Sequence, residues 1–299
     1  MKAQPPFPWL GGKGRLAGDI LSRLPGPARE RTYIEPFFGG GAIFFTRKMS
    51  GIEVINDRNG EIIHFFRILR DNADDLIRYL QNTPYSRKVF YAWRAIENPE
   101  KLSEIERAAR FFYIARSSFA AESTRQTPAW AFAKIADNRA RSMATVIDRE
   151  LLLIRDRLRY ALIENDDAVR VIRRFDSEAA IIYCDPPYVH ETRREGGYAD
   201  EMSDRDHEDL LAVLTECAGY VALSGYPNDL YREYLEEEHG WSYVDFEHSC
   251  LANRTSGIAG DIDRKRTERF WMNPRLTEWN AVQAPRQSSL FDLVMDGVA

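Results

Sequence analysis

The chain has 299 residues, of which 44% are hydrophobic and 29% charged, and its formal net charge at pH 7 is −5. This composition is typical of a globular protein with room for one large domain that carries an insertion, or for two domains. No stretch approaches the roughly 18 consecutive apolar residues of a membrane helix. Prolines and glycines follow Met1 and Lys2, in place of the apolar segment of a signal peptide. We therefore expect a cytoplasmic protein that makes no membrane contact.

Cysteine and histidine usage argues against metal and disulfide sites. The three cysteines, Cys184, Cys217 and Cys250, are far apart and odd in number. This spacing predicts neither a disulfide framework nor a zinc motif, and it is typical of a reducing compartment. The five histidines form no HExxH motif or other paired spacing. We expect no metal site.

The charge is unevenly distributed along the chain. Residues 101–160 contain 12 Lys or Arg against 7 Asp or Glu, so the remainder of the chain is strongly acidic. Net charge is a poor guide to nucleic-acid binding when the charges are segregated. The asymmetry leaves room for a basic DNA-facing segment, although a solvated helical surface would have the same composition.

The first two predicted elements follow an unusual N-terminal arm. Trp9, a glycine pair and Lys13 could form a lid that touches a ligand by ring face and by charge, or Trp9 could pack on the core. Residues 16–24 have helical spacing and end at a Pro-Gly-Pro breaker. Residues 31–35 then predict a strand that ends at Glu35.

A glycine turn joins this strand to an apolar helix that starts at Ala42. The turn contains Phe37, Gly39 and Gly41, and strand, glycine turn and helix form the first βα unit of a nucleotide-binding type of fold. It is not the dinucleotide fingerprint, because Phe44 stands where a third glycine would be.

A second short strand is predicted at residues 52–55, and Asn56 and Asp57 follow it. An acid at the tip of the second strand can accept hydrogen bonds from ribose hydroxyls. Alternatively, Asp57 or Asn56 caps the next helix.

Residues 59–160 change to helical spacing and contain no glycine from position 61 to position 159. A segment of this length is too long for a crossover connection and predicts a helical subdomain. Arg116, Ser118, Arg139 and Arg141 in this segment are suited to phosphate or guanine contacts. Solvated surface arginines are the alternative for each of them.

The α/β pattern resumes at residues 161–167 and leads to the strand on which the prediction of chemistry depends. Residues 181–184 predict a buried strand that stops at Asp185, Pro186, Pro187 and Tyr188. Asp185 and the carbonyl of Pro186 can accept both hydrogens of an exocyclic amine, and the Tyr188 ring gives a base a face to stack on. An incidental acid in a proline turn is the alternative.

Three further strands are predicted at residues 219–223, 243–246 and 267–271. Between the last two, residues 249–266 are polar and end in Arg264, Lys265 and Arg266. A connection of this length is typical of a functional segment. Its basic residues could contact a phosphate backbone, and solvated side chains are the alternative.

Taken in order, six of these segments resemble the Dam-like (D12 class) DNA adenine-N6 methyltransferases, with the closest similarity to phage and prophage members. They are Trp-Leu-Gly-Gly-Lys at 9–13, Glu-Pro-Phe-Phe-Gly-Gly-Gly at 35–41, Asn-Asp at 56–57, Glu-Asn-Asp-Asp at 164–167, Asp-Pro-Pro-Tyr at 185–188 and Leu-Ser-Gly-Tyr at 223–226. The resemblance extends nearly to Pro274. It implies an α/β fold, that of the class I S-adenosylmethionine-dependent methyltransferases, with a Rossmann-like mixed sheet and a helical insertion subdomain. An acid in the first place of the Asp-Pro-Pro-Tyr motif is similar to the adenine-N6 type, whereas a serine there would suggest cytosine N4.

The resemblance also implies functional residues. The catalytic set that holds a flipped-out adenine would be Asp185, Pro186, Pro187 and Tyr188. S-adenosyl-L-methionine would be bound by Trp9, Lys13, Glu35, Phe37, Gly39, Gly41, Asp57, Asn165, Asp167 and Asp185. DNA would be contacted by Arg116, Ser118, Arg139, Arg141, Arg264 and Lys265. The implied reaction is direct attack of adenine N6 on the sulfonium methyl, in bacterial or phage-encoded double-stranded DNA modification.

The resemblance and the segment patterns also predict how the chain is divided into regions. Residues 1–58 and 160–274 would be the catalytic domain, 59–159 the target-recognition subdomain and 275–299 a C-terminal tail. Within the tail, Gln287 to Phe291 resemble the peptide by which bacterial proteins dock on the replication sliding clamp, although this end could also pack on the domain as a last helix. Two other functions remain open: a catalytically inactive DNA-binding or regulatory protein, and an RNA or protein-glutamine methyltransferase, for which Asn-Pro-Pro-Tyr would be more usual.

Overall fold

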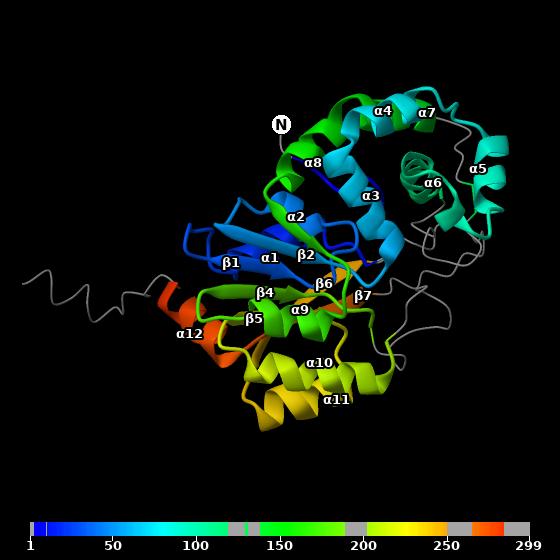
Figure 1. Ribbon diagram of the computed structural model, residues 1–299. Helices are drawn as coiled ribbons and strands as arrows, with labels where there is room; N and C mark the ends of the chain where they lie inside the picture. The colour runs from blue at the N-terminus through cyan, green and yellow to red at the C-terminus, as the bar shows by residue number, and fades with distance from the viewer. Residues whose placement is uncertain are drawn as a thin grey trace, which may run out of the picture.

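A seven-stranded sheet forms the centre of the computed structural model, which describes residues 3–9, 11–118, 129–130, 138–188, 202–249 and 265–283, without the side chains of 248–249 and 265–266. The strand order is β3-β2-β1-β4-β5-β7-β6 (Figure 1). The strands are β1 (Thr32–Glu35), β2 (Ile52–Asn56), β3 (Ala161–Glu164), β4 (Ala180–Cys184), β5 (Tyr220–Gly225), β6 (Ser242–Ser249) and β7 (Lys265–Met272). Only β7 runs against the others, because it pairs antiparallel with both β5 and β6. Each strand lies where the sequence predicts one.

Helices cover both faces of this sheet. Along each strand the side chains alternate between two apolar clusters: Tyr33 and Ile181 face one, and Ile34 and Ile182 face the other. Strands that are apolar on both faces are typical of a buried parallel sheet. In Figure 1, α9 (Ala168–Phe175), α10 (Asp204–Glu216) and α11 (Asp229–Tyr231), which continues as a π-helix through Glu238, lie below the sheet. The helix α2 (Ala42–Thr46) lies on the opposite side.

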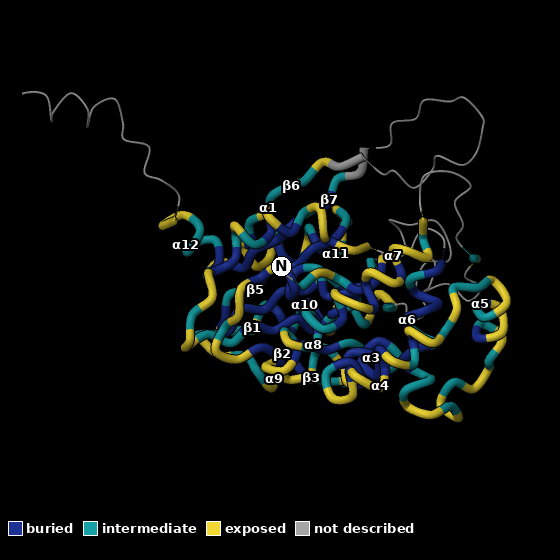
Figure 2. The backbone as a smooth tube through the Cα atoms, turned by 90° about the horizontal axis from the view of Figure 1, so that it is seen from above, coloured by how far each residue is buried: buried dark blue, intermediate teal, exposed yellow. Residues whose placement is uncertain are grey.

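The helical insertion predicted between β2 and β3 is present. Among its described residues, the α-helices are α3 (Gly60–Asp71), α4 (Ala73–Gln81), α5 (Arg87–Arg94), α6 (Glu104–Ser117), α7 (Arg139–Thr145) and α8 (Leu151–Leu158), with a short 3-10 turn before α6 and a π-helical turn between α7 and α8. Seen from above in Figure 2, α5, α6 and α7 lie to one side of the sheet, and buried backbone continues from the sheet into α3 and α6. The insertion therefore shares one hydrophobic cluster with the sheet.

The return of the insertion to the sheet depends on a buried ion pair. Arg157 on α8 pairs with Glu53 on β2, and its guanidinium lies 3.8 Å from the ring centroid of Phe44. Glu53 is 1% exposed, so the pair is almost fully removed from water. Loss of one partner would leave a buried charge without compensation, which typically costs about 3–5 kcal/mol.

Asn59 caps α3, where the sequence offers Asp57 or Asn56. The side chain of Asn59 accepts hydrogen bonds from the backbone amides of Glu61 and Ile62. Asn56 is fully buried, and its amide group donates instead to the carbonyls of Pro36 and Asp166. The Asp57 carboxylate accepts a hydrogen bond from the amide of Gly39.

The C-terminal part of the described chain differs from the predicted tail. Residues 275–283 belong to a helix, α12 (Pro274–Gln283), whose residue Leu276 is fully buried. Asn280 donates from its side-chain amide to the carbonyl of Arg23, directly after α1 (Ala17–Ser22). The helix therefore packs on the sheet domain. Gln287 to Phe291 lie outside the described residues.

Within the described ranges, no helix is long and apolar enough to span a lipid bilayer.

Candidate active site

A cavity of about 330 Å³ opens where β1, β2 and β4 end. The strand order reverses between β1 and β4, and in open α/β sheets ligands bind outside the carboxyl ends of the strands at such a point. Eight of the residues predicted to bind the cofactor line this cavity: Trp9, Lys13, Glu35, Phe37, Gly39, Gly41, Asp57 and Asp185. Segments that lie far apart in the sequence therefore meet in one place.

The glycine turn after β1 forms the floor of the cavity. Gly39 and Gly41 have φ angles of +48° and +73°, which favour glycine. The amide of Gly39 donates to the Asp57 carboxylate over 2.8 Å, and Asp57 therefore stabilises the turn. A Cβ atom at Gly39 would lie 2.7 Å from the indole of Trp9. Bare backbone is therefore required beneath this ring.

The N-terminal arm, residues 3–9 and 11–14, crosses from the insertion to the cavity. Phe7 packs with ring centroids 5.5 Å from both Phe65 on α3 and Phe111 on α6. Arg116 on α6 donates to the carbonyl of Pro6 over 2.8 Å. Further along the arm, Trp9 lies over the glycine turn. The arm thus ties the helical insertion to the wall of the cavity.

Lys13 lies at the centre of a network that includes the Asp-Pro-Pro-Tyr turn. Its ammonium donates to Asp185 Oδ1 over 2.7 Å and to the Tyr188 hydroxyl over 2.6 Å, and it lies 3.1 Å from Glu268 Oε1. The Tyr188 hydroxyl in turn donates to Glu268 Oε1 over 2.5 Å. The Tyr188 ring packs edge-on to Tyr226, with centroids 4.5 Å apart. Two carboxylates therefore share one cation beside an aromatic ring.

Two of the acids in this region, Glu35 and Asp185, have raised pKa values. The pKa of Glu35 is raised to about 8, mainly by burial; a hydrogen bond from Tyr33 opposes this shift, and the nearby Asp185 carboxylate adds to it. Burial also raises the pKa of Asp185, the Lys13 ammonium opposes this shift, and the Glu268 carboxylate adds to it. Perturbed acids in a cleft are characteristic of functional sites.

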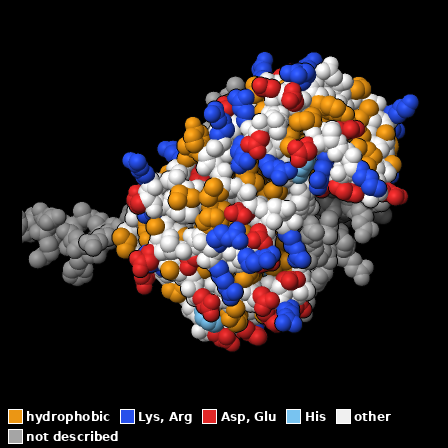
Figure 3. All heavy atoms as spheres, viewed as in Figure 1, with side chains coloured by type: hydrophobic (Ala, Val, Ile, Leu, Met, Phe, Trp, Pro, Cys, Tyr) orange, Lys and Arg blue, Asp and Glu red, His pale blue; other side chains and the backbone are white. Residues whose placement is uncertain are grey.

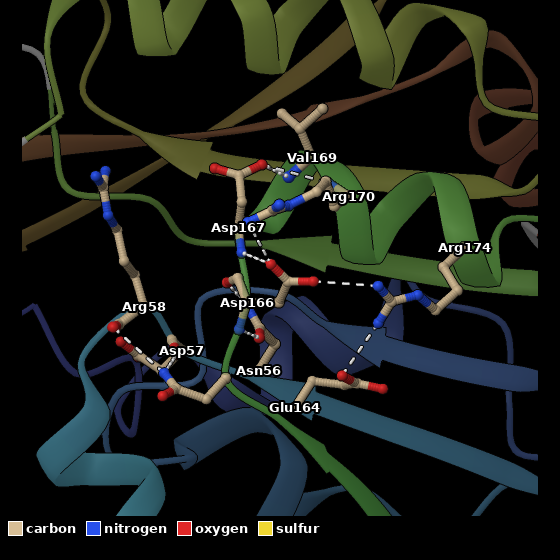
Figure 4. Close-up of polar contacts among 10 residues, drawn as sticks. Asn56, Asp57, Arg58, Glu164, Asp166, Asp167, Val169, Arg170 and Arg174 are labelled. Atoms are coloured by element: carbon tan, nitrogen blue, oxygen red, sulfur yellow. Dashed lines mark hydrogen bonds and ion pairs between the residues drawn. The ribbon is translucent and has the colours of Figure 1, made fainter.

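Two residues predicted to bind the cofactor, Asn165 and Asp167, lie in the loop between β3 and α9, and their side chains do not line the cavity. Asp167 caps α9 by accepting from the amides of Val169 and Arg170 (Figure 4). The Asn165 amide donates to the carbonyl of Asp57 over 2.7 Å. Asn165 and Asp167 are not among the described residues that line the cavity. Asn165 adjoins it through the backbone of Asp57.

Ion pairs hold this loop against the end of the sheet. Arg174 donates to Glu164 and to Asp166, each over 3.1 Å (Figure 4). Asp166 also donates its backbone amide to the side chain of Asn56 over 2.9 Å. The ends of β2 and β3 are therefore fixed relative to each other, and Asp57 is positioned by this arrangement.

Of the described residues predicted to bind DNA, two are used within the fold. Ser118 is buried, and its hydroxyl donates to the carbonyl of Ile114. Arg116 is used by the N-terminal arm and also donates to Ser142. Arg139 and Arg141 begin α7, and Arg141 is exposed. Arg264 and the side chain of Lys265 lie outside the description. Figure 3 shows basic and acidic side chains interspersed on one face of the insertion.

Glu268 is the functional candidate that the sequence interpretation missed. It lies in β7, two residues before the buried Phe270, so strand alternation puts both side chains on one face. A glutamate at an inward position of an apolar strand is rarely buried without a partner, and this was the available signal. Its partner Lys13, however, lies 255 residues away in the chain.

The strand order with antiparallel β7, together with the cavity at the β1–β4 reversal, defines a class I methyltransferase fold of the Rossmann-like type. Residues 9–247 match the D12 class N6 adenine-specific DNA methyltransferase family. The chain belongs to this family, as its motifs predict, and the family implies S-adenosylmethionine as methyl donor and DNA as substrate.

Relatives of known name agree with this assignment. The Type II methyltransferase M1.LlaDCHI of Lactococcus lactis subsp. cremoris is 29% identical over 285 residues, which are 87% of this chain and 92% of the relative. The DNA N-6-adenine-methyltransferase of Escherichia phage P1 is 27% identical over 86% of this chain, and the chain spans 34% of that protein. The DNA adenine methylase of Haemophilus influenzae is 26% identical over 72% of this chain and 75% of the relative.

Proposed function

We propose that this chain methylates N6 of an adenine turned out of duplex DNA, with S-adenosylmethionine in the cavity below Trp9 and the target base at Asp185 and Tyr188. The observation that carries the proposal is the position of Asp185. Its side chain lines the cavity and also belongs to the network that contains the Tyr188 ring. One carboxylate therefore borders both proposed subsites.

The residues of the cavity fit this cofactor. At Gly39 and Gly41 the space that a Cβ atom would take is occupied by the rings of Trp9, Phe38 and Phe45, so the turn packs closely beneath aromatic side chains at the wall of the cavity. Three carboxylates, those of Glu35, Asp57 and Asp185, line the cavity and complement a cationic ligand. S-adenosylmethionine supplies, when bound, a methyl group activated by a sulfonium charge. Glu35 and Asp185 would face its positive end.

The contribution of the protein to the reaction is mainly alignment. Asp185 and the Pro186 carbonyl would accept the two hydrogens of the adenine amine, which turns the nitrogen lone pair toward the cavity. Tyr188, supported edge-on by Tyr226, would stack on the base. Correct positioning of two reactants can lower a barrier by up to about 7–11 kcal/mol. Cys184 is fully buried in β4 and takes no part.

Substitution of Asp185 tests this proposal. Asp185→Asn keeps the shape of the side chain but replaces one acceptor oxygen with a donor group, and Asp185→Ala removes both. We expect methyl transfer to fall by about 10- to 100-fold or more in each variant, because loss of one charged acceptor typically costs about 1.5–3 kcal/mol or more in a desolvated site. The readout is labelled methyl in N6-methyladenine after digestion of the DNA.

Asp156→Asn is the matched control, because Asp156 is an exposed acid that pairs with its neighbour Arg155. Near-normal turnover in Asp185→Asn and Asp185→Ala would overturn the proposal. Label that resists DNase and is released by RNase or protease would indicate an RNA or protein substrate instead. Duplex binding by the unsubstituted chain without any transfer would indicate a DNA-binding protein that lacks activity.

Two finer assignments remain proposals. The helical insertion would recognise the target sequence, with Arg141, which is exposed, and Arg139, which is partly exposed, as the candidates. The Gln287 to Phe291 segment would dock on the sliding clamp. Truncation after residue 283 should abolish clamp capture without changing methyl transfer, and unchanged capture would reject this docking.

A further inference from the structure

Glu268 makes contacts that the proposed reaction does not use. Its carboxylate is almost fully buried, and Oε1 receives both the Tyr188 hydroxyl at 2.5 Å and the Lys13 ammonium at 3.1 Å. Lys13 is equally buried, with 4% of its side chain exposed. Asp185 is the more open partner, because 20% of its side chain is exposed. One buried cation thus lies between a buried carboxylate and a more open one.

The direction of β7 explains how Glu268 reaches this place. β7 is antiparallel to β5, and Arg269 is opposite Gly225, the last residue of β5. The residue before Arg269 therefore lies just beyond the end of β5, at the edge of the sheet where β4 leads into Asp185. A strand parallel to β5 would present its other end there. The reversed strand therefore brings an acid to the end of the sheet where Asp185 lies.

A buried cation shared by two acids has a specific consequence for substrate binding. If Lys13 had only Asp185 as a partner, an amine that bound to Asp185 would have to separate this ion pair. A buried ammonium would then be left without a counter-charge, which is costly by several kcal/mol. Glu268 removes this cost, because Lys13 remains paired with it when Asp185 turns to the substrate. The bond from Tyr188 to the same oxygen also fixes the rotation of the ring.

We propose that Glu268 is a positioning residue: it holds Lys13 and the Tyr188 hydroxyl so that Asp185 is released to accept the amine of the target base. This inference rests on the proposed role of Asp185. It predicts that Glu268 acts through Lys13 on the catalytic step, and that it touches neither the base nor the methyl donor.

Glu268→Gln is the central variant, because glutamine keeps the shape and can still accept from Tyr188 but carries no charge. We expect kcat for methyl transfer to fall by about 10- to 100-fold, the effect of a lost bond to a charged group. The KM for the methyl donor should change by less than about threefold, because a pure positioning effect appears in kcat. Glu268→Asp, which keeps the charge, should restore part of the rate.

The pH profile separates this role from a merely structural one. Asp185 is faced by Lys13 from the arm, Glu35 from β1, Tyr183 from β4, Tyr188 from the following turn and Glu268 from β7. Among these groups, the negative charge of Glu268 raises the pKa of Asp185. Removal of that charge should move the acidic limb of kcat/KM to lower pH, while a general loss of stability would leave the limb in place.

Asp245→Asn is the matched control, since Asp245 on β6 pairs with Arg269, the neighbour of Glu268. This variant should keep both the rate and the position of the acidic limb. In a Lys13→Met background, Glu268→Gln should lower kcat by less than about twofold further, because the two residues act as a unit. If Glu268→Gln lowered kcat as much in the Lys13→Met background as in the parent chain, the proposal would be contradicted.

Three further results overturn the inference: a kcat within about twofold of normal in Glu268→Gln, an acidic limb that does not move, or equal losses in Glu268→Asp and Glu268→Gln. Should Glu268→Gln fail to fold, as judged by its melting transition, the rate and pH profile of Glu268→Asp decide. Failure of the proposed function is distinguishable, because it appears in Asp185→Asn whatever Glu268 does.

Discussion

Glu35 shows how much a single side chain in this site is controlled by burial. It is 3% exposed and accepts a hydrogen bond from the Tyr33 hydroxyl over 2.9 Å. Burial raises the pKa of Glu35 to about 8, so in the absence of a cation the carboxyl is largely protonated at pH 7. A cationic ligand in the cavity favours the ionised form. Ligand binding and proton release at Glu35 are therefore linked.

We predict that affinity for S-adenosylmethionine rises with pH through about 8 and that Glu35→Gln removes this dependence. Below that pH the carboxyl must lose a proton to bind a cation, so affinity should fall by up to about tenfold per pH unit. Calorimetric titration from pH 6 to 9 measures the effect. An unchanged slope in Glu35→Gln would contradict the assignment, and Asp245→Asn serves as the control.

The same shift predicts a stability change with a definite sign. The folded pKa of Glu35 lies above the unfolded value of 4.5, so the ionised unfolded chain is favoured increasingly as pH rises from 4.5 to about 8. The penalty is absent below pH 4.5 and complete above about 8. Glu35→Gln should therefore melt at a higher temperature than the parent at pH 8, with a smaller difference at pH 5. The melting temperatures of both chains test this, and a difference that shrinks as pH rises would refute it.

At the scale of elements, the β1 to α2 connection carries the strongest local constraint in the cavity. Its positive φ angles and the closeness of Trp9 both exclude side chains at Gly39. Gly18 in α1 is a useful contrast, because a Cβ atom there would have no neighbour within 4 Å. A side chain is therefore excluded at Gly39 and has room at Gly18.

We predict that Gly39→Ala weakens S-adenosylmethionine binding by at least about tenfold and lowers stability by about 1 kcal/mol or more, through backbone strain and displacement of Trp9. Gly18→Ala should raise stability by about 0.5–1 kcal/mol and leave binding unchanged, because alanine is the better helix former. Urea unfolding and cofactor titration measure both. Tight binding by Gly39→Ala would show that the turn does not support the ligand.

The elements themselves were largely predictable, because β1, β2 and β4 are short apolar runs stopped by acids, glycines or prolines. The helical insertion followed from its apolar spacing and absence of glycine. What local patterns could not supply was pairing over distance. The cap Asn59 was missed because Asn56, which looks equally suitable, is recruited by Pro36 and Asp166. Glu268 was missed for the same reason, since only the folded sheet brings it to Lys13.

At the scale of the whole molecule, the N-terminal arm joins the helical insertion to the proposed active site. Phe7 packs on α3 and α6, Arg116 holds the backbone of Pro6, and Lys13 reaches Asp185. Arg116 is withdrawn from water in this contact, which lowers its pKa. The sequence interpretation gave the same arginine to DNA. The two roles predict different kinetics.

We predict that Arg116→Ala weakens S-adenosylmethionine binding by about 3- to 10-fold, because loss of about one hydrogen bond loosens the arm that carries Trp9 and Lys13. Arg141→Ala, at an exposed position, is the control and should leave cofactor binding unchanged. If Arg116 instead contacts DNA, its loss would weaken duplex binding and reduce the salt dependence of that binding by about one ion. Cofactor and duplex titrations at several salt concentrations distinguish these outcomes.

The path of the arm has a consequence for engineering new target specificities. Under the proposal that the insertion recognises the target, exchange of residues 59–159 between relatives is the direct way to build chimeras, yet such a graft would separate Phe7 from Phe65 and Phe111. A hybrid that keeps its own first residues would combine mismatched aromatic partners beside the donor cavity. We expect functional chimeras to require transfer of the N-terminal segment through Lys13 together with the helical insertion. The two segments, although far apart in the sequence, would then come from the same parent.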